Sequence, residues 1–189
     1  MAYPQTSDSA HHDHHDQPAT GFKRWLFATN HKDIGTMYLV FSLTMFFVGG
    51  SMAMLIRAEL FHPGLQLMQP EFFNQLITNH GLIMIFGAII PAFVGLANWM
   101  IPLQIGAPDM ALPRMNNFSF WILPFAFTLM LSSLFVPGGA IAGGWTLYPP
   151  LSLQTGDSFP MTIFAIHMMG ASSIMGAINV IVTVFNLRA

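Results

Sequence analysis

The sequence predicts an all-α integral membrane protein with four transmembrane helices, and three observations support this prediction. Charged residues make up only 7% of the 189 residues and hydrophobic residues 53%, whereas about 25% of the residues in a soluble globular protein are charged. The mean hydropathy is +0.56. Four apolar segments follow one another, each about as long as the ~20 residues that a helix needs to cross the hydrocarbon of a bilayer. So few charges cannot cover a water-facing surface, and we therefore expect the chain to face lipid.

Residues 1–24 differ from the rest of the chain. They are rich in Ser, Thr, Gln and Pro and include the run HHDHHD from His11 to Asp16. No apolar stretch typical of a signal peptide lies there, so we expect a disordered polar tail. The His/Asp run could chelate a metal ion, but a solvated tail is the simpler interpretation.

The membrane domain, residues 25–189, carries the four apolar segments at about 34–56, 72–103, 118–136 and 161–187. We expect helices because lipid offers no hydrogen-bond partner to an unpaired backbone group. The segments also lack the polar alternation of a transmembrane strand and are longer than the ~11 residues that such a strand needs. Pro91 and Pro124 fall inside spans, where we expect kinks that neighbouring helices tolerate.

The basic residues predict the orientation of these spans. Five of the six lie on one side of the predicted membrane, and only Arg57 lies on the other. Because loops rich in Lys and Arg stay in the cytoplasm, we expect a cytoplasmic N-terminus and outer loops at about 58–71 and 137–160. The second outer loop is rich in Gly and Pro around Trp145 and Tyr148. Aromatic side chains often anchor a protein at the interface, but this composition also indicates a loop folded onto something.

Composition excludes several classes of function. The chain contains no cysteine, which excludes disulfides, thiolate metal sites and cysteine nucleophiles within it. The formal net charge of −2 gives no indication of nucleic-acid binding.

Two histidines lie inside predicted spans, where an ionisable residue is a candidate functional group. His80 lies about eight residues into the second span, about 12 Å along a helix, and His167 lies at a similar depth in the fourth. Each could be a neutral histidine bonded to a neighbouring helix. Imidazole is also a common axial ligand of haem iron, so a bis-histidine haem between the two spans is a second interpretation.

Further polar residues mark the two ends of the predicted bundle. At the outer end, Arg57 could snorkel to the interface or donate to a buried acceptor. The segment ELFHPGLQ, Glu59 to Gln66, gathers oxygen donors of the kind that bind Ca²⁺. At the inner end and deeper lie Asn98, Asp109, Asn116, Asn117, Tyr38, Ser172, Ser173 and Asn179. Such residues either join helices to one another or begin a proton path from a carboxylate at the cytoplasmic mouth.

Six strings of residues resemble subunit I of the haem-copper terminal oxidases, in the order of that family. They are RWLFATNHKDIGTMYL (24–39), IRAEL (56–60), NHGLIMIF (79–86), IGAPDMALPRMNNFSFW (105–121), GWTLYPPL (144–151) and GASSIMGAIN (170–179). The resemblance covers nearly everything after the polar tail. It implies the first four helices of a twelve-helix bundle that reduces O2 with haem and copper and pumps protons.

The resemblance also implies roles for individual residues. His80 matches the axial ligand of the low-spin haem a, and Arg57 matches the arginine that bonds the haem formyl group. Trp145 and Tyr148 match residues that lie beside the haem propionates. Asp109 matches the entrance of the D proton pathway, with Asn98, Asn116, Tyr38, Ser172, Ser173 and Asn179 along it. A structural Ca²⁺ site of some bacterial members matches Glu59, His62, Gly64 and Gln66. His167 then returns to a packing or hydrogen-bonding role, because the family takes its second axial histidine from a later helix.

The expected electron donor is cytochrome c. Quinol-oxidising members of the family hold an arginine and an aspartate where this chain has Val48 and Met52. The resemblance implies association with the remaining helices of subunit I and with oxidase subunits II and III in the bacterial inner membrane. The ligands of haem a3 and copper B are not among these residues, so we expect this stretch to be the N-terminal part of a longer polypeptide and inactive alone. A self-contained four-helix haem protein, a structural subunit without a cofactor and a quinol oxidase are the alternatives.

Overall fold

The computed structural model describes residues 21–189, and every regular element in that range is helical. The elements are α1 (Phe22–Leu26), α2 (His31–Glu59), α3 (Pro70–Leu82), the π-helix η1 (Ile83–Ile89), α4 (Ile90–Ile105), α5 (Pro113–Ser132), the 3-10 helices η2 (Ser133–Phe135) and η3 (Leu151–Gln154), and α6 (Ser158–Leu187). The His/Asp run of the N-terminal tail lies outside the described residues. The first described element, α1, begins at Phe22, whereas the polar tail was expected to extend to residue 24.

The four predicted transmembrane spans are confirmed. Four helical stretches are long and apolar enough to cross a membrane: α2, the continuous stretch Pro70–Ile105, the stretch Pro113–Phe135, and α6. Most helix ends extend beyond the predicted segments because polar residues there continue the backbone hydrogen bonding; α2, for example, begins at His31 with Asn30 as its N-cap. The chain is therefore a multi-pass membrane protein.

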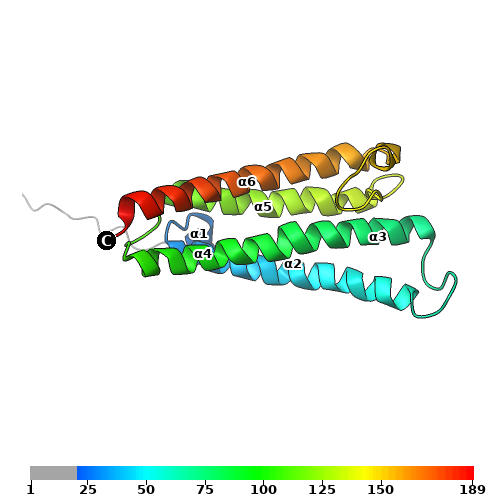
Figure 1. Cartoon of the computed structure of the whole chain (residues 1–189), viewed down its shortest axis with the longest axis horizontal. Coiled ribbons are helices and arrows are strands. Elements are labelled where there is room, and N and C mark those ends of the chain that lie inside the picture. Colours follow the sequence, from blue (N-terminus) through cyan, green and yellow to red (C-terminus); the bar gives the residue numbers. More distant parts are fainter. Residues whose placement is uncertain (1–20) are drawn as a thin grey trace, which may run out of the picture.

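The four spans run antiparallel in an elongated bundle (Figure 1). Helix α6 packs along α5, and α2 packs along α3, η1 and α4. The loop between α2 and α3 and the long loop between α5 and α6 lie at one end of the bundle, opposite α1 and the C-terminus (Figure 1). The predicted outer residues therefore lie in the half of the bundle that carries these loops, and the predicted inner residues extend from the other end to the middle of α6.

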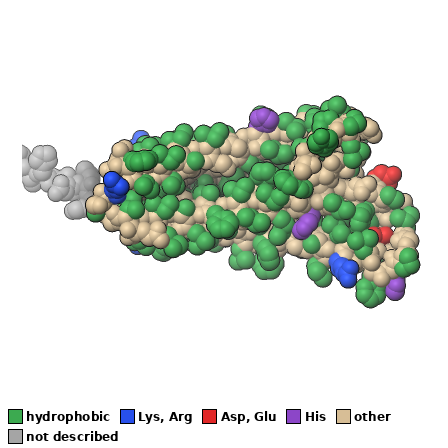
Figure 2. Space-filling view, in the orientation of Figure 1, with side chains coloured by type: hydrophobic (Ala, Val, Ile, Leu, Met, Phe, Trp, Pro, Cys, Tyr) green, Lys and Arg blue, Asp and Glu red, His purple; other side chains and the backbone are tan. Residues whose placement is uncertain are grey.

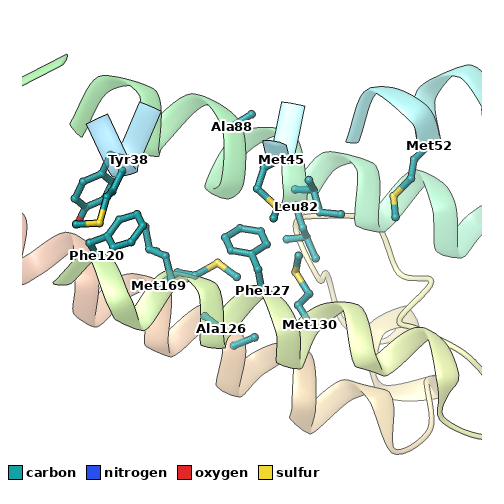
Figure 3. Packing of buried hydrophobic residues seen from close by; sticks show 14 of the residues in the cluster. Tyr38, Met45, Met52, Leu82, Ala88, Phe120, Ala126, Phe127, Met130 and Met169 are labelled. Atoms are coloured by element: carbon teal, nitrogen blue, oxygen red, sulfur yellow. The ribbon is translucent and has the colours of Figure 1, made fainter. Parts of the chain in front are cut away.

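A layer of aromatic and methionine side chains fills the centre of the bundle (Figure 3). Phe127 and Met130 of α5 are almost completely buried. Tyr38 of α2 meets Phe120 edge-on, with 5.1 Å between the ring centroids. This apolar layer separates the polar residues of the two ends.

Glycines allow α2 to approach its neighbours closely. A Cβ atom on Gly35 would lie 2.9 Å from the carbonyl oxygen of Gly95 in α4, and one on Gly49 would lie 2.7 Å from Sδ of Met84 in η1. Small residues at such crossings are typical of membrane helices, where close van der Waals packing holds helices together.

The second span contains a π-helix, η1, which ends two residues before Pro91. Proline has no N–H and cannot donate the usual helical hydrogen bond. The N–H of Ile90 bonds the carbonyl oxygen of Ile85, five residues back, and Ser42 of α2 donates its hydroxyl to the carbonyl oxygen of Ala88 at 2.6 Å. A kink was also expected at Pro124, which lies inside α5; this helix continues through the proline.

Large apolar side chains cover the sides of the bundle, and charged side chains lie at its two ends (Figure 2). Phe47, Phe93 and Phe185 are each more than three-fifths exposed. A surface of this kind is stable against lipid or other transmembrane helices but not against water.

Candidate functional site

His80 lies on α3 and is fixed by a bond to the neighbouring helix. Its Nδ1 atom lies 2.9 Å from the carbonyl oxygen of Gly49 in α2. A carbonyl oxygen only accepts, so Nδ1 carries a proton, and in the neutral ring Nε2 then keeps its lone pair. Histidines that bind metals are commonly oriented in this way, by a hydrogen bond from the other ring nitrogen.

The long outer loop packs onto α3 beside this histidine. A Cβ atom on Gly81 would lie 3.0 Å from Cβ of Trp145, and the N–H of Gly144 donates to the hydroxyl of Thr78 at 2.9 Å. Trp145 therefore lies against the residue that follows His80. Tyr148 lies further along the loop and is 76% exposed, so the structure brings Trp145 but not Tyr148 against α3.

The other predicted outer residues lie at the end of α2 and in the loop that follows. Arg57 is exposed. Glu59 is buried, and its carboxylate accepts backbone N–H groups from Gln66 at 2.8 Å, Leu67 at 2.6 Å and Met68 at 3.2 Å. These bonds fold the loop around Glu59.

The remaining predicted calcium ligands are less closely gathered. His62 is exposed and meets the ring of Phe61 edge-on, and the side chain of Gln66 donates to the carbonyl oxygen of Pro63 at 3.2 Å. Gly64 has φ +91° and forms the turn. Among residues 21–189, no group of three or more His, Asp or Glu side chains is arranged to hold a metal ion. The Ca²⁺ site stays a prediction.

At the inner end, Asp109 pairs with a histidine. The carboxylate oxygen Oδ1 of Asp109 lies 3.1 Å from Nδ1 of His31 and accepts the backbone N–H of His31 at 3.1 Å. The side chain of Asp109 is 36% exposed, whereas that of His31 is 6% exposed. The pair thus has one member that meets water and one that is enclosed at the start of α2.

Hydrogen-bonded polar groups continue inward from this pair. Asn116 of α5 donates to Oδ1 of Asn98 in α4 at 2.6 Å. One turn deeper, the hydroxyl of Ser119 lies 2.9 Å from that of Tyr38, and Ser172 of α6 donates to the carbonyl oxygen of Ser119 at 2.6 Å. Three helices therefore contribute polar groups around Ser119.

A small cavity of about 20 Å³ follows these groups. Its lining combines Tyr38, Ser172 and Ser173 with apolar side chains of η1, α4, α5 and α6. A cavity of this size has room for a single water molecule, and the hydroxyl groups of Tyr38, Ser172 and Ser173 are the polar side-chain groups in its lining that could bind it.

Asn179 lies on the α6 side of the inner end. Its Oδ1 atom accepts the backbone N–H of Leu112 at 2.9 Å, and Thr183 accepts the N–H of Ala111 at 2.9 Å. These bonds hold the turn between α4 and α5 against α6, next to Asp109.

Three residues of the inner site were not predicted from the sequence: His31, Ser119 and Thr183. The signal for His31 was its place directly before an apolar span. The signal for Ser119 was its spacing of three residues from Asn116, and that for Thr183 its spacing of four residues from Asn179, since residues three or four apart share a helix face.

His167 does not join this outer site. It is exposed on α6, and its Nδ1 atom lies 2.8 Å from the carbonyl oxygen of Ile163 in its own helix. Helix α6 packs mainly on α5 and α4, whereas α3 packs on α2 and η1. The two histidines thus lie on helices that are not principal neighbours.

Comparison with known proteins identifies the family. The family described as cytochrome c and quinol oxidase polypeptide I matches residues 33–189. The chain belongs to this family. By that description, the members of the family are oxidase polypeptides.

Three bacterial relatives are similar to the chain over most of its length. The chain is 45% identical over 176 residues to the probable cytochrome c oxidase subunit 1-alpha of Streptomyces coelicolor, covering 92% of this chain and 30% of the relative. It is 47% identical over 174 residues to cytochrome c oxidase subunit 1 of Corynebacterium glutamicum, and the match covers 89% of this chain and 30% of the relative. It is 42% identical over 216 aligned residues to cytochrome c oxidase subunit 1 of Cereibacter sphaeroides, and the match covers 97% of this chain and 38% of the relative. The chain thus spans about a third of the length of these relatives.

Proposed function

We propose that the chain supplies one axial ligand of the low-spin haem and the inner part of a proton path in a cytochrome c oxidase that reduces O2 to water and pumps protons. The observation that carries this proposal is the bond from Nδ1 of His80 to the carbonyl oxygen of Gly49. It leaves Nε2 free in the neutral tautomer that binds haem iron.

The surroundings of His80 fit a haem. His80 is half-buried, so part of its ring stays accessible from outside these helices, and apolar side chains such as Phe47 and Met54 cover an exposed face of the neighbouring helix α2. A low-spin haem bound there would supply reversible one-electron transfer between a donor and the O2-reducing centre. We propose that Arg57 donates to the haem formyl group and that Trp145 and Tyr148 lie beside the propionates. The position of Trp145 against Gly81 supports its part of this assignment.

The polar groups of the inner end support a path for protons. Asp109 is exposed enough to take a proton from water, and the residues that follow it offer donors and acceptors in sequence. We propose that Asn98 and Asn116 hold water near the mouth, that Asn179 holds the turn beside it, and that Tyr38, Ser172 and Ser173 lead to the small cavity. Hydroxyl groups and single waters in a chain can pass a proton without moving far.

Cytochrome c is the proposed electron donor, with haem a as the low-spin group. Val48 and Met52 of α2 are apolar side chains packed in the core, and neither can bond a quinol headgroup. The names of the relatives also support this donor. Haem a3, copper B, oxidase subunits II and III and the remaining helices would complete the enzyme in the bacterial inner membrane.

Replacing His80 in the complete oxidase tests the proposal. In a His80→Leu variant, we expect the absorbance band of the low-spin haem to be lost, because iron would lack one axial ligand. The matched variant His167→Leu should keep the band. Retention of the band in His80→Leu would contradict the ligand assignment, and its loss in His167→Leu would favour the bis-histidine alternative. Both outcomes are read from reduced-minus-oxidised spectra of purified enzyme.

A further inference from the structure

A single buried side chain of α3 fastens the long outer loop. Gln75 is 7% exposed. Its Nε2 atom donates to the carbonyl oxygen of Gly138 at 3.2 Å, and its Oε1 atom accepts the N–H of Ala140 at 3.2 Å. The carboxamide thus pairs with the backbone on both sides of Gly139, as a neighbouring strand would.

The loop is shaped to receive this carboxamide. Gly139 has φ +75°, and a Cβ atom on it would lie 2.7 Å from Cδ of Gln75. Gly138 also has a positive φ, +89°, but a Cβ atom there would meet nothing within 4 Å. Only at Gly139, therefore, does the absence of a side chain serve the contact with Gln75.

A second bond fastens the same loop one turn further along α3. Thr78 is completely buried and accepts the N–H of Gly144 at 2.9 Å. Its own hydroxyl proton goes to the carbonyl oxygen of Asn74 at 2.9 Å. Gln75, Thr78 and Gly81 lie at intervals of three residues and therefore form one stripe of the helix. The stripe contacts Gly138, Gly144 and Trp145 in the same order along the loop.

We infer that Gln75 is a positioning residue, which fixes the register of the outer loop so that Trp145 covers α3 beside His80. Its effect on haem rests on the proposed function of His80. A loop released from Gln75 would admit water to the side of the haem. Water stabilises the more highly charged oxidised state, so the midpoint potential of the low-spin haem would fall.

The experiment uses two variants and a matched control for each in the complete oxidase. Gln75→Leu removes both hydrogen bonds at similar size, and Gln154→Leu is the same change at an exposed position of the same loop. Gly139→Ala displaces the carboxamide, and Gly138→Ala carries a similar backbone strain without that collision. Amide hydrogen exchange of residues 137–145 and the midpoint potential of the low-spin haem are measured for all four.

We expect exchange at least about tenfold faster and a lower midpoint potential in Gln75→Leu than in Gln154→Leu, and in Gly139→Ala than in Gly138→Ala. Faster exchange with an unchanged potential would overturn the positioning role, since the contact would then be structural alone. Equal behaviour of Gly139→Ala and Gly138→Ala would overturn it as well, even if Gln75→Leu did not assemble. The proposed function fails separately, through retention of the low-spin band in His80→Leu.

Discussion

Two histidines at opposite ends of the bundle have their tautomers set by oxygen acceptors. Nδ1 of His80 lies 2.9 Å from a backbone carbonyl oxygen, and Nδ1 of His31 lies 3.1 Å from the carboxylate of Asp109. In both rings, Nε2 is therefore not used in the bond to this oxygen. Nε2 of His80 is available to a ligand at the outer end. Nε2 of His31 is buried without a partner among the described residues, and a buried nitrogen of this kind is a place for an ordered water.

Replacement of Asp109 tests the inner end of the proton path. Asparagine has nearly the same size and can still accept the N–H of His31, but it cannot carry a proton. In the complete oxidase, we expect Asp109→Asn to slow turnover at least about tenfold, a modest loss for a positioned acid–base group. The matched variant Asp157→Asn, at the outer end, should behave as the parent. Unchanged turnover and proton release in vesicles containing Asp109→Asn would remove Asp109 from the path.

At the scale of helices, the contact between α2 and η1 depends on one glycine of a pair. A Cβ atom on Gly49 would meet Met84 and Ile83, whereas one on Gly50 would meet nothing within 4 Å. The carbonyl oxygen of Gly49 also accepts from His80. Close approach of the two helices and orientation of the histidine thus depend on the same residue.

Alanine at each of these glycines gives opposite expectations. Gly49→Ala should destabilise the bundle by about 1–3 kcal/mol, as overpacking in a well-packed core does. Gly50→Ala should be neutral or stabilising by up to about 1 kcal/mol, because alanine favours a helix. Thermal inactivation of the complete oxidase in detergent measures both. Equal stability of the two variants would show that α2 and η1 separate at little cost.

The elements show which parts of the fold follow from composition. Lipid selects apolar side chains directly, so hydropathy predicted all four spans. Helix ends follow other rules: α5 begins at Pro113, five residues before its predicted start, since proline is favoured in the first turn of a helix. The π-helix has no composition of its own, and Pro91 predicted only a kink.

The candidate site divides in the same way. An ionisable residue is rare within a span, so His80 and Asp109 could be singled out from the sequence alone. The contacts of Gln75 with Gly138 and Ala140 join residues more than sixty positions apart. Glutamine near a helix start is unremarkable in a sequence, and only the folded loop reveals its partners.

At the scale of the whole molecule, the bundle keeps two kinds of polar chemistry apart. The outer end holds His80 and the loop with Trp145, and the inner end holds Asp109 and its hydrogen-bonded neighbours. Between them lies the apolar layer around Phe127 and Met130 (Figure 3).

The orientation of the bundle can be tested by labelling introduced cysteines, because these 189 residues contain none. Gln154 and Gln104 are both exposed, at opposite ends of the bundle. With any other cysteine of the complete subunit removed, a membrane-impermeant maleimide should label Gln154→Cys in intact spheroplasts. Gln104→Cys should be labelled only after the membrane is opened. The reverse pattern would place the N-terminus outside.

The π-helix between Ile83 and Ile89 gives this span a place where its length can change during evolution. Each of its hydrogen bonds spans five residues, so each turn contains more residues than a turn of an α-helix does. Elsewhere in the span, deletion of one residue would rotate every later side chain by about 100° about the helix axis. Within η1, the same deletion can be absorbed by a return to α-helical bonding. His80 on one side and Asn98 on the other would then keep their faces, so the loss of one residue in this segment would disturb neither end.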